Sequence, residues 1–589
     1  MEKLRKDMNP AFCWNLADIF ENNAAWQAAL EAVSEKVAKI SAVAGTLGVS
    51  REALKAGLDQ LFATAEELEK VYVYTFLYSS GDNGDPEAQE MEEKATQVYV
   101  AFSTAMAFLN PEILAIDPEK LDVWMQEEDM AVYRHMIADI CRARAHTLSE
   151  NEERLLAMLG DAAQTPKKTF DLFESVDMSF PPLENGSALT HALFGRYRES
   201  ADAEIRKEAF EKYFGEYKKY INTITSLYSG SVKLDSYFAR ARRHESALEA
   251  ALYSNDVPKA LYENLIACVH EAVPAMGRYL ELRRKAMGLE KLSLVDLYVP
   301  LVKDVDAEIE FEDAKEMVLT ALKPLGEEYQ SLLKRAYNER WIDVYENKGK
   351  TTGAYSCGVF GVHPYVLLNY SKKYDDAFTL AHELGHSMHS WYSDTTQEYV
   401  NHDYTIFVAE VASTVNEVLM IRYLLSVEKD PRKRAYLLNH LLEQFRTTVF
   451  RQTLFAEFEM KAHGMYEAGE PLTAQSLNAL YHDLNKTYYP NAEGTPETDS
   501  EWARIPHFYR AFYVYQYATG FCSAVAIADR ILNHGGAADY LKFLSTGGSM
   551  YPIEELKIAG VDLTSPEPIR SALKLFEETI AELEELLKV

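Results

Sequence analysis

Apolar residues recur at three- and four-residue spacing along most of the chain, which is the repeat of an amphipathic helix. The pattern is clear in residues 24–47 and 201–238, which are also rich in good helix formers such as Ala, Leu, Glu and Lys. Clusters of Gly, Pro, Asn and Asp interrupt it, as in residues 81–86 and 490–496. The sequence therefore predicts a mainly α protein.

Local signals refine this prediction at three places. Ser149 and Glu152 precede an apolar pair and predict a capping box that begins a helix. Residues 170–191 are rich in Pro, Ser, Gly and Asp and predict a loop or small hairpin after an amino-terminal helical part. Residues 348–370 place four glycines around short apolar runs and predict two short strands with tight turns. We expect one small sheet in an otherwise helical fold.

Composition sets the class of partner and the compartment. Apolar residues make up 48% of 589, enough for a large core, and 60 basic against 91 acidic residues give a net charge of −31. This balance argues against nucleic acid and anionic membranes as partners. It indicates a solvated surface, with a mild preference for cationic substrates as the alternative. Five scattered cysteines without a C-x-x-C pair, and no signal-peptide core, predict a cytoplasmic protein.

One motif carries candidate chemistry: His382, Glu383 and His386 form H-E-x-x-H. On a helix, residues four apart share a face, so the two imidazoles can reach one ion. Glu383 is rotated by about 100° from His382, which suits a general base that takes a proton from water. The motif predicts a zinc site with Glu383 as the base.

Two histidines leave a catalytic zinc one protein ligand short. His389 stands where the metzincin pattern requires glycine, so that pattern fails. Glu410 lies 24 residues after His386 between apolar neighbours, and a second, antiparallel helix could bring it onto the same ion. A surface glutamate is the alternative, but the apolar neighbours favour a ligand. Glu417, seven residues further and nearly on the same face, is predicted to hold a ligand imidazole.

Several segments together resemble the thimet-oligopeptidase family of zinc peptidases and, within it, the oligoendopeptidase F branch. The matching segments are residues 144–153, 353–356, 382–389, 407–411 and 505–509. The resemblance implies a large helical ellipsoid with a deep central channel that admits short unfolded peptides. It also implies an amino-terminal helical domain over residues 1–190 and a zinc-peptidase catalytic domain over residues 191–589, with the channel between halves. His389 matches an extra histidine of the family, which we expect to pack or to support the ligands.

Residues 507–517 are unusually aromatic, and a core stripe is the ordinary explanation. Amide hydrolysis also needs donors for the oxyanion that develops at the scissile carbonyl. The resemblance implies that Tyr515, and less closely His507, supply them. Tyr509 and Tyr513 are further candidates for substrate contacts.

The glycine-rich segment around Gly353 and Tyr355 could be an ordinary turn-rich hairpin. The resemblance implies that it lines the substrate cleft. An exposed strand edge there could pair with an extended peptide backbone.

We therefore predict an endopeptidase for oligopeptides with one Zn²⁺ per chain. Three alternatives remain open: a zinc carboxypeptidase of related helical build, a non-enzymatic scaffold that binds peptides, and a di-iron carboxylate bundle. The last requires a second Glu-x-x-His pair on a neighbouring helix, which the sequence does not offer beside Glu383 and His386. Cleavage preference and oligomeric state are not readable from the sequence.

Overall fold

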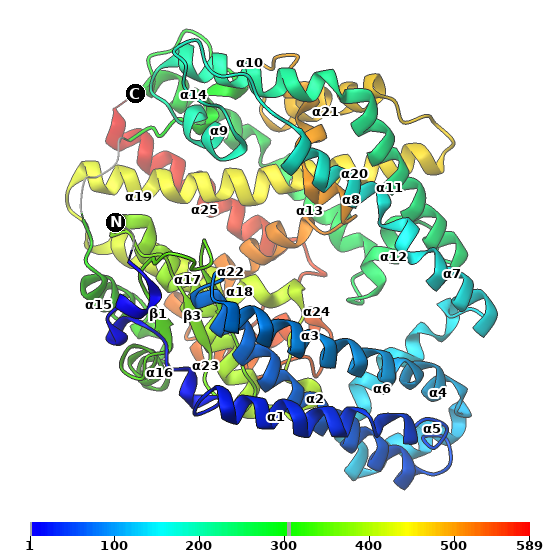
Figure 1. The fold of residues 1–589 in the computed structure, drawn as a ribbon. Helices are drawn as coiled ribbons and strands as arrows, with labels where there is room; N and C mark the ends of the chain where they lie inside the picture. The colour runs from blue at the N-terminus through cyan, green and yellow to red at the C-terminus, as the bar shows by residue number, and fades with distance from the viewer. Residues whose placement is uncertain (1–2, 303–307, 589) are drawn as a thin grey trace. The chain divides into compact units, whose positions relative to one another are not determined.

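The structure is a computed structural model that describes residues 3–302 and 308–588. Helices dominate it and a three-stranded sheet completes it, so the predicted mainly helical class is confirmed (Figure 1). The chain forms two compact units. Unit 1 comprises Met1–Ala145, Ala307–Arg422 and Ile527–Val561, and unit 2 comprises His146–Asp306, Tyr423–Ala526 and Asp562–Val589. The predicted domain boundary at residue 190 stays a prediction.

Unit 1 contains the α-helices of the chain's beginning and those that surround the sheet. They are α1 (Asn23–Val37), α2 (Arg51–Gly81), α3 (Pro86–Ala105), α4 (Leu109–Ala115), α5 (Pro118–Met125), α6 (Arg134–Arg142), α15 (Phe311–Ala321), α16 (Glu327–Asn338), α17 (Tyr374–Thr396), α23 (Ala537–Leu544) and α24 (Pro552–Ile558). Helices α1, α2 and α3 lie side by side around a buried core (Figure 1). Two helices continue from one unit into the other: α18 (Ile406–Val427) and α22 (Tyr515–His534).

The sheet of unit 1 has the order β1-β3-β2, with β1 (Ile342–Asp343) parallel and β2 (Tyr355–Cys357) antiparallel to β3 (Tyr365–Leu367). Strand β2 is therefore an edge strand. The sheet packs against α17 through β2 and β3. The two predicted strands and the small sheet beside the H-E-x-x-H helix are confirmed, whereas β1 was not predicted because two residues carry no periodicity.

Among its described residues, unit 2 consists of helices, their connecting segments and one isolated parallel β-bridge between Ser293 and Glu493. Its α-helices are α7 (Glu150–Ala163), α8 (Thr165–Leu172), α9 (His191–Arg198), α10 (Ala203–Lys219), α11 (Ile221–Ala241), α12 (Ala247–Tyr253), α13 (Lys259–Glu271), α14 (Val273–Ala286), α19 (Pro431–Gln444), α20 (Arg451–Glu467), α21 (Ala474–Tyr488) and α25 (Glu567–Leu587). The predicted capping box at α7 is confirmed, since the Ser149 backbone N–H donates to the Glu152 carboxylate over 3.0 Å. The loop predicted over residues 170–191 is confirmed for residues 178–190, whereas residues 170–177 are helical, as the end of α8 and a π-helical turn (Phe173–Asp177).

One stretch of unit 1, Pro86–Ala115, has the length and mean hydropathy (1.3) of a membrane-spanning helix, and 11% of its apolar window is buried. These two properties alone do not show a span, because core helices of soluble proteins also have them. The expectation of no membrane partner stays a prediction. All five cysteines are free thiols.

Candidate metal centre and active site

The start of helix α17 is capped by the carboxylate of Asp376. Asp376 accepts the backbone N–H groups of Ser371 (2.8 Å) and Lys373 (2.9 Å), which otherwise have no partner at a helix start. From there the helix runs 23 residues through the H-E-x-x-H motif. His382 and His386 consequently stand one turn apart on the same face.

Glycine at position 385 lets α18 approach α17 closely. A Cβ at Gly385 would lie 2.5 Å from the Cα of Ser413 and 2.7 Å from the carbonyl oxygen of Ala412, both backbone atoms of α18. A buried amide locks the same contact: Asn416 Nδ2 donates to the Ala381 carbonyl over 3.0 Å. Tyr329 of α16 donates to Asn416 Oδ1 over 2.9 Å. Sequence reasoning did not assign Gly385 or Asn416, although glycine inside a helical pattern is itself a signal of close packing.

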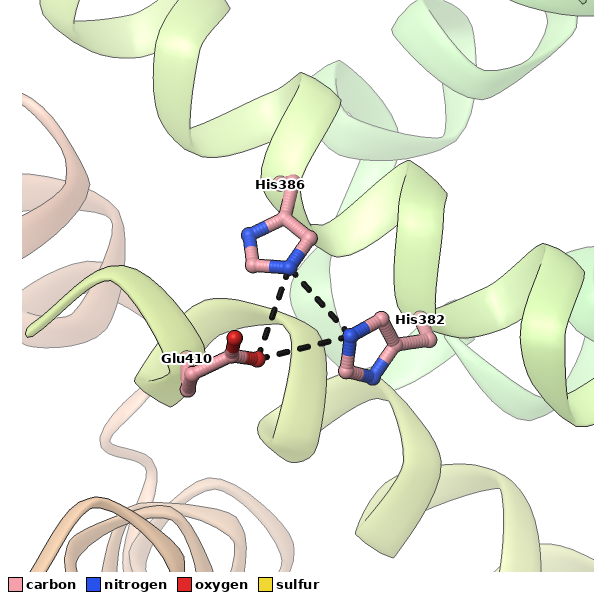
Figure 2. Close-up of side chains that lie close together, drawn as sticks. All are labelled: His382, His386 and Glu410. Carbon is pink, nitrogen blue, oxygen red and sulfur yellow. Dashed lines mark hydrogen bonds and ion pairs between the residues drawn. The ribbon is translucent and has the colours of Figure 1, made fainter. Parts of the chain in front are cut away.

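The close approach brings three side chains together, and we call His382, His386 and Glu410 the metal group. The Nε2 atoms of His382 and His386 lie 3.2 Å apart, and Glu410 Oε2 lies 3.4 Å from His382 Nε2 and 3.5 Å from His386 Nε2. Figure 2 shows the two imidazoles and the carboxylate pointing toward one another. Among the described residues, this is the only group of three or more His, Cys, Asp or Glu side chains whose donor atoms converge in this way.

The triangle of donor atoms fits one face of a tetrahedron around a metal ion. Zinc binds imidazole nitrogen and carboxylate oxygen at about 2.0–2.1 Å, which places neighbouring ligands of a tetrahedron about 3.3–3.4 Å apart. The three measured separations of 3.2, 3.4 and 3.5 Å lie around that value. The group therefore leaves one corner of the tetrahedron without a protein ligand.

Electrostatics at the metal group favour a cation. Burial lowers the pKa of His382, but hydrogen bonds with Glu410 and Glu417 outweigh burial and raise that pKa to about 10. Hydrogen bonds with His382 and His386 hold the pKa of the Glu410 carboxyl well below its usual range. His382 Nδ1 donates to Glu417, which leaves Nε2 facing the other two donors.

Glu383 is buried on α17, with 6% of its surface exposed. Burial raises the pKa of its carboxyl, and the neighbouring His382 and His386 oppose that shift. A carboxyl whose pKa lies above its ordinary value can both accept and return a proton more easily near neutral pH.

His389 packs and is not part of the metal group. Its ring stacks on Tyr404 with 3.6 Å between the ring centroids, and the residue is fully buried. Burial lowers the pKa of this imidazole to about 3, so it is neutral at physiological pH.

The predicted substrate-binding residues of unit 1 lie at the edge of the sheet. Gly353 has a φ of +84° in the turn before β2, with open space where a Cβ would stand. The Tyr355 ring packs inward, 5.3 Å between centroids from Phe76 of α2. Ser356 lies 2.8 Å (Oγ to Oγ) from Ser387, the residue that follows His386, so the edge strand is joined to the H-E-x-x-H helix.

The predicted oxyanion residues belong to unit 2, whereas the metal group belongs to unit 1. Tyr515 begins α22, is 2% exposed and packs on Tyr262, and burial raises the pKa of its phenol. His507 is exposed, 6.5 Å between ring centroids from Tyr513, and its pKa is lowered by partial burial and by Arg510. Tyr509 stacks on Phe170 with centroids 4.5 Å apart. Their roles stay predictions.

Two histidines, a carboxylate from a neighbouring helix and a buried glutamate beside them make up the donor set of a metallopeptidase. Comparison with known proteins gives the family. The sequence model for Peptidase family M3 matches residues 196–575, and the model for Oligopeptidase F matches residues 112–180. The chain belongs to peptidase family M3, which makes it a metal-dependent endopeptidase that hydrolyses peptides.

Relatives of similar length support this assignment over the whole chain. Oligopeptidase PepF of Bacillus subtilis is 43% identical over 591 residues, covering 99% of this chain and 88% of the relative. An oligoendopeptidase F homolog of Lactococcus lactis is 39% identical over 598 residues, covering 100% and 99%. The crystal structure of oligoendopeptidase-F from Enterococcus faecium is 36% identical with a TM-score of 0.74, covering 96% of this chain and 99% of that one.

Proposed function

We propose that the chain is a zinc-dependent endopeptidase that hydrolyses internal bonds of short, unfolded oligopeptides. The observation that carries the zinc assignment is the triangle of the metal group, with sides of 3.2, 3.4 and 3.5 Å. His382, His386 and Glu410 would hold one Zn²⁺ per chain. Glu417 keeps the His382 imidazole in the tautomer that offers Nε2 as a ligand.

The bound ion would supply Lewis-acid chemistry, which polarises the attacking water and the scissile carbonyl. Glu383 accepts the proton of that water and later gives it to the leaving amine. Its raised pKa supports both halves of this shuttle, because the carboxyl holds a proton more readily than an exposed glutamate does.

The developing oxyanion needs a hydrogen-bond donor, and Tyr515 is our candidate, with His507 as a second. The burial that raises the pKa of Tyr515 keeps its phenol protonated, so it can donate. Tyr509 and Tyr513 remain candidates for substrate contacts. These assignments rest on the sequence resemblance.

Substrate peptides would lie along the edge of β2, after the turn at Gly353. Only one side of β2 is paired, to β3, so its outer backbone groups can bond to an extended peptide. We also propose a cytoplasmic location and a sequence-domain boundary near residue 190, between the two family matches that end at 180 and begin at 196.

A peptide blocked at both ends, with a fluorophore and a quencher, tests the proposal. We expect cleavage at an internal bond, loss of activity after chelation, and recovery as zinc is added back to one equivalent per chain. A carboxypeptidase would leave the blocked peptide intact. Recovery with a different metal but not with zinc would contradict the zinc assignment while leaving the peptidase class in place.

A further inference from the structure

A cavity of about 670 Å³ lies beside the edge strand β2 in unit 1. Its walls come from α2, α3, β2, α17, the start of α18 and the segment between α17 and α18. It adjoins the candidate active site at two points: Ser356 of β2, whose hydroxyl meets Ser387 over 2.8 Å, and Ala409, the residue before Glu410. A peptide paired with β2 would pass the mouth of this cavity.

The lining of the cavity includes several acidic side chains. Glu69, Asp394, His402 and Asp403, which we call the cavity group, all line it, and no Lys or Arg among the described residues does. His402 Nδ1 lies 2.9 Å from Asp394 Oδ1, and His402 Nε2 lies 3.5 Å from Glu69 Oε2. When all three carboxylates are ionised, they leave a charge of −2 even if His402 is protonated. Burial raises the pKa of both Glu69 and Asp394, and the neighbouring His402 opposes that shift.

Aromatic rings also line the cavity. Tyr72 and Tyr99 have ring centroids 5.4 Å apart and are 39% and 50% exposed, which is unusual for large rings with an apolar body. Phe102 and Tyr399 add further ring surface to the lining. A planar guanidinium binds both kinds of wall, since it stacks on aromatic faces and pairs with carboxylates.

A second metal ion is not the occupant that this geometry favours. The cavity group surrounds a space, and among the described residues only the metal group brings three donor atoms within 4.8 Å of one another. His402 is also already engaged on both nitrogens. An elongated cation with an apolar stem fits the mixed lining better than a bare ion.

We propose that the cavity is a subsite that receives a basic side chain, arginine above all, of the peptide substrate. The alternation of side chains along a strand would turn one residue of a peptide paired with β2 into the cavity. The apolar stem would lie along Tyr72 and Tyr99, and the guanidinium would face the cavity group. The subsite rests on the proposed function, since it needs a peptide bound at β2.

Pairs of blocked fluorogenic peptides that differ only by arginine or citrulline at one position test this subsite. Citrulline keeps the shape of arginine without its charge. At one position near the cleaved bond we expect kcat/KM to favour arginine by about tenfold or more, the size of one partly buried charge pair. At the remaining positions the ratio should stay close to one.

Variants of the cavity group test whether the preference for arginine over citrulline comes from the cavity. Asp403→Asn and Glu69→Gln should each lower the arginine-to-citrulline ratio several-fold. Glu66→Gln is the matched control: Glu66 stands on α2 like Glu69, pairs with Lys70 over 2.7 Å and lies outside the lining, so the ratio should not change. Asp403 is exposed, so its variant is expected to fold even if Glu69→Gln does not.

A ratio near one at every position, with both peptides cleaved and chelator-sensitive, would overturn the subsite and leave the proposed function intact. A ratio lowered equally by Glu66→Gln would also overturn it, because the preference would then come from overall charge. Failure to cleave either peptide in the presence of zinc would instead contradict the proposed function.

Discussion

Unit 1 contains two groups of histidine and carboxylate side chains that differ in where their free atoms point. In the metal group, His382 uses Nδ1 for Glu417 and leaves Nε2 facing the other two donors. In the cavity group, both His402 nitrogens face carboxylates, and the acids stand around an open volume. The same residue types therefore make a point site for an ion in one place and a lined pocket in the other. The metal group and the cavity group therefore differ in where their nitrogen and oxygen atoms point, and not in the types of residue that they contain.

The largest effect should come from the base beside the metal group. Glu383→Gln removes the proton acceptor but preserves the side chain's shape, so kcat should fall by about 10²–10⁴-fold with zinc still bound. Cleavage rates of the blocked fluorogenic peptide measure kcat, and metal analysis measures the zinc content of the variant. Glu398→Gln, an exposed carboxylate just after α17, is the control and should leave both values unchanged. Near-normal turnover in Glu383→Gln would remove that residue from the mechanism.

The next largest effect should come from Glu417, the carboxylate that accepts the hydrogen bond of His382 Nδ1. Glu417→Gln still accepts the Nδ1 hydrogen bond but loses the charge, and zinc affinity should weaken by about 10–100-fold. Competition with a chromophoric chelator measures it. An affinity equal to that of the unaltered protein would mean that Glu417 only packs.

The helix contact that builds the metal group should be sensitive to one methyl group. Gly385→Ala would force backbone atoms of α17 and α18 apart, with an expected cost of about 1–3 kcal/mol in unfolding free energy. It should also weaken zinc binding, because Glu410 moves with α18. The control Gly464→Ala has open space at its Cβ and should be neutral or slightly stabilising. A stable Gly385→Ala protein with full zinc affinity would contradict the packing argument.

The smallest effect should come from Glu555, a buried carboxylate with no histidine beside it. Both oxygens of Glu555 on α24 are buried without a hydrogen-bond partner, and burial raises the pKa of this carboxyl to about 8. The folded protein holds that proton more tightly than the unfolded chain, whose pKa is about 4.3. Stability from this group is thus present at low pH and is lost as pH rises from about 4.3 through 8.

Glu555→Gln removes the titration, so the difference in Tm between variant and unaltered protein should grow by a few degrees from pH 5 to pH 9. Thermal melts across that range measure it. A difference that does not change with pH would mean that Glu555 is ionised or solvated in the folded protein.

The metal group was largely predictable because its geometry is local. The spacing of four residues on one helix places His382 and His386 on the same face. The apolar neighbours of Glu410 indicated a second buried helix, and the chain between the two helices is long enough for an antiparallel return. The crossing that delivers Glu410 was not predictable in detail, since it depends on Gly385 meeting Ser413 and on Asn416 bonding to Ala381.

The cavity group could not be found from the sequence. Glu69 and His402 are more than 300 residues apart in the chain, and no periodicity connects α2 to the segment after α17. The packing of α2 against the segment after α17 brings their side chains to one cavity. The helical class and small sheet are confirmed, while the central channel, the domain boundary and the roles of Tyr515 and His507 stay predictions.

Anomalous diffraction at the zinc edge, from crystals of protein purified with zinc, would show directly whether the metal group binds zinc. We expect one strong peak about 2.0–2.2 Å from Nε2 of His382, Nε2 of His386 and the Glu410 carboxylate, and none at the cavity group. A zinc peak at the cavity group, or none at the metal group in protein that still cleaves peptides, would contradict this expectation.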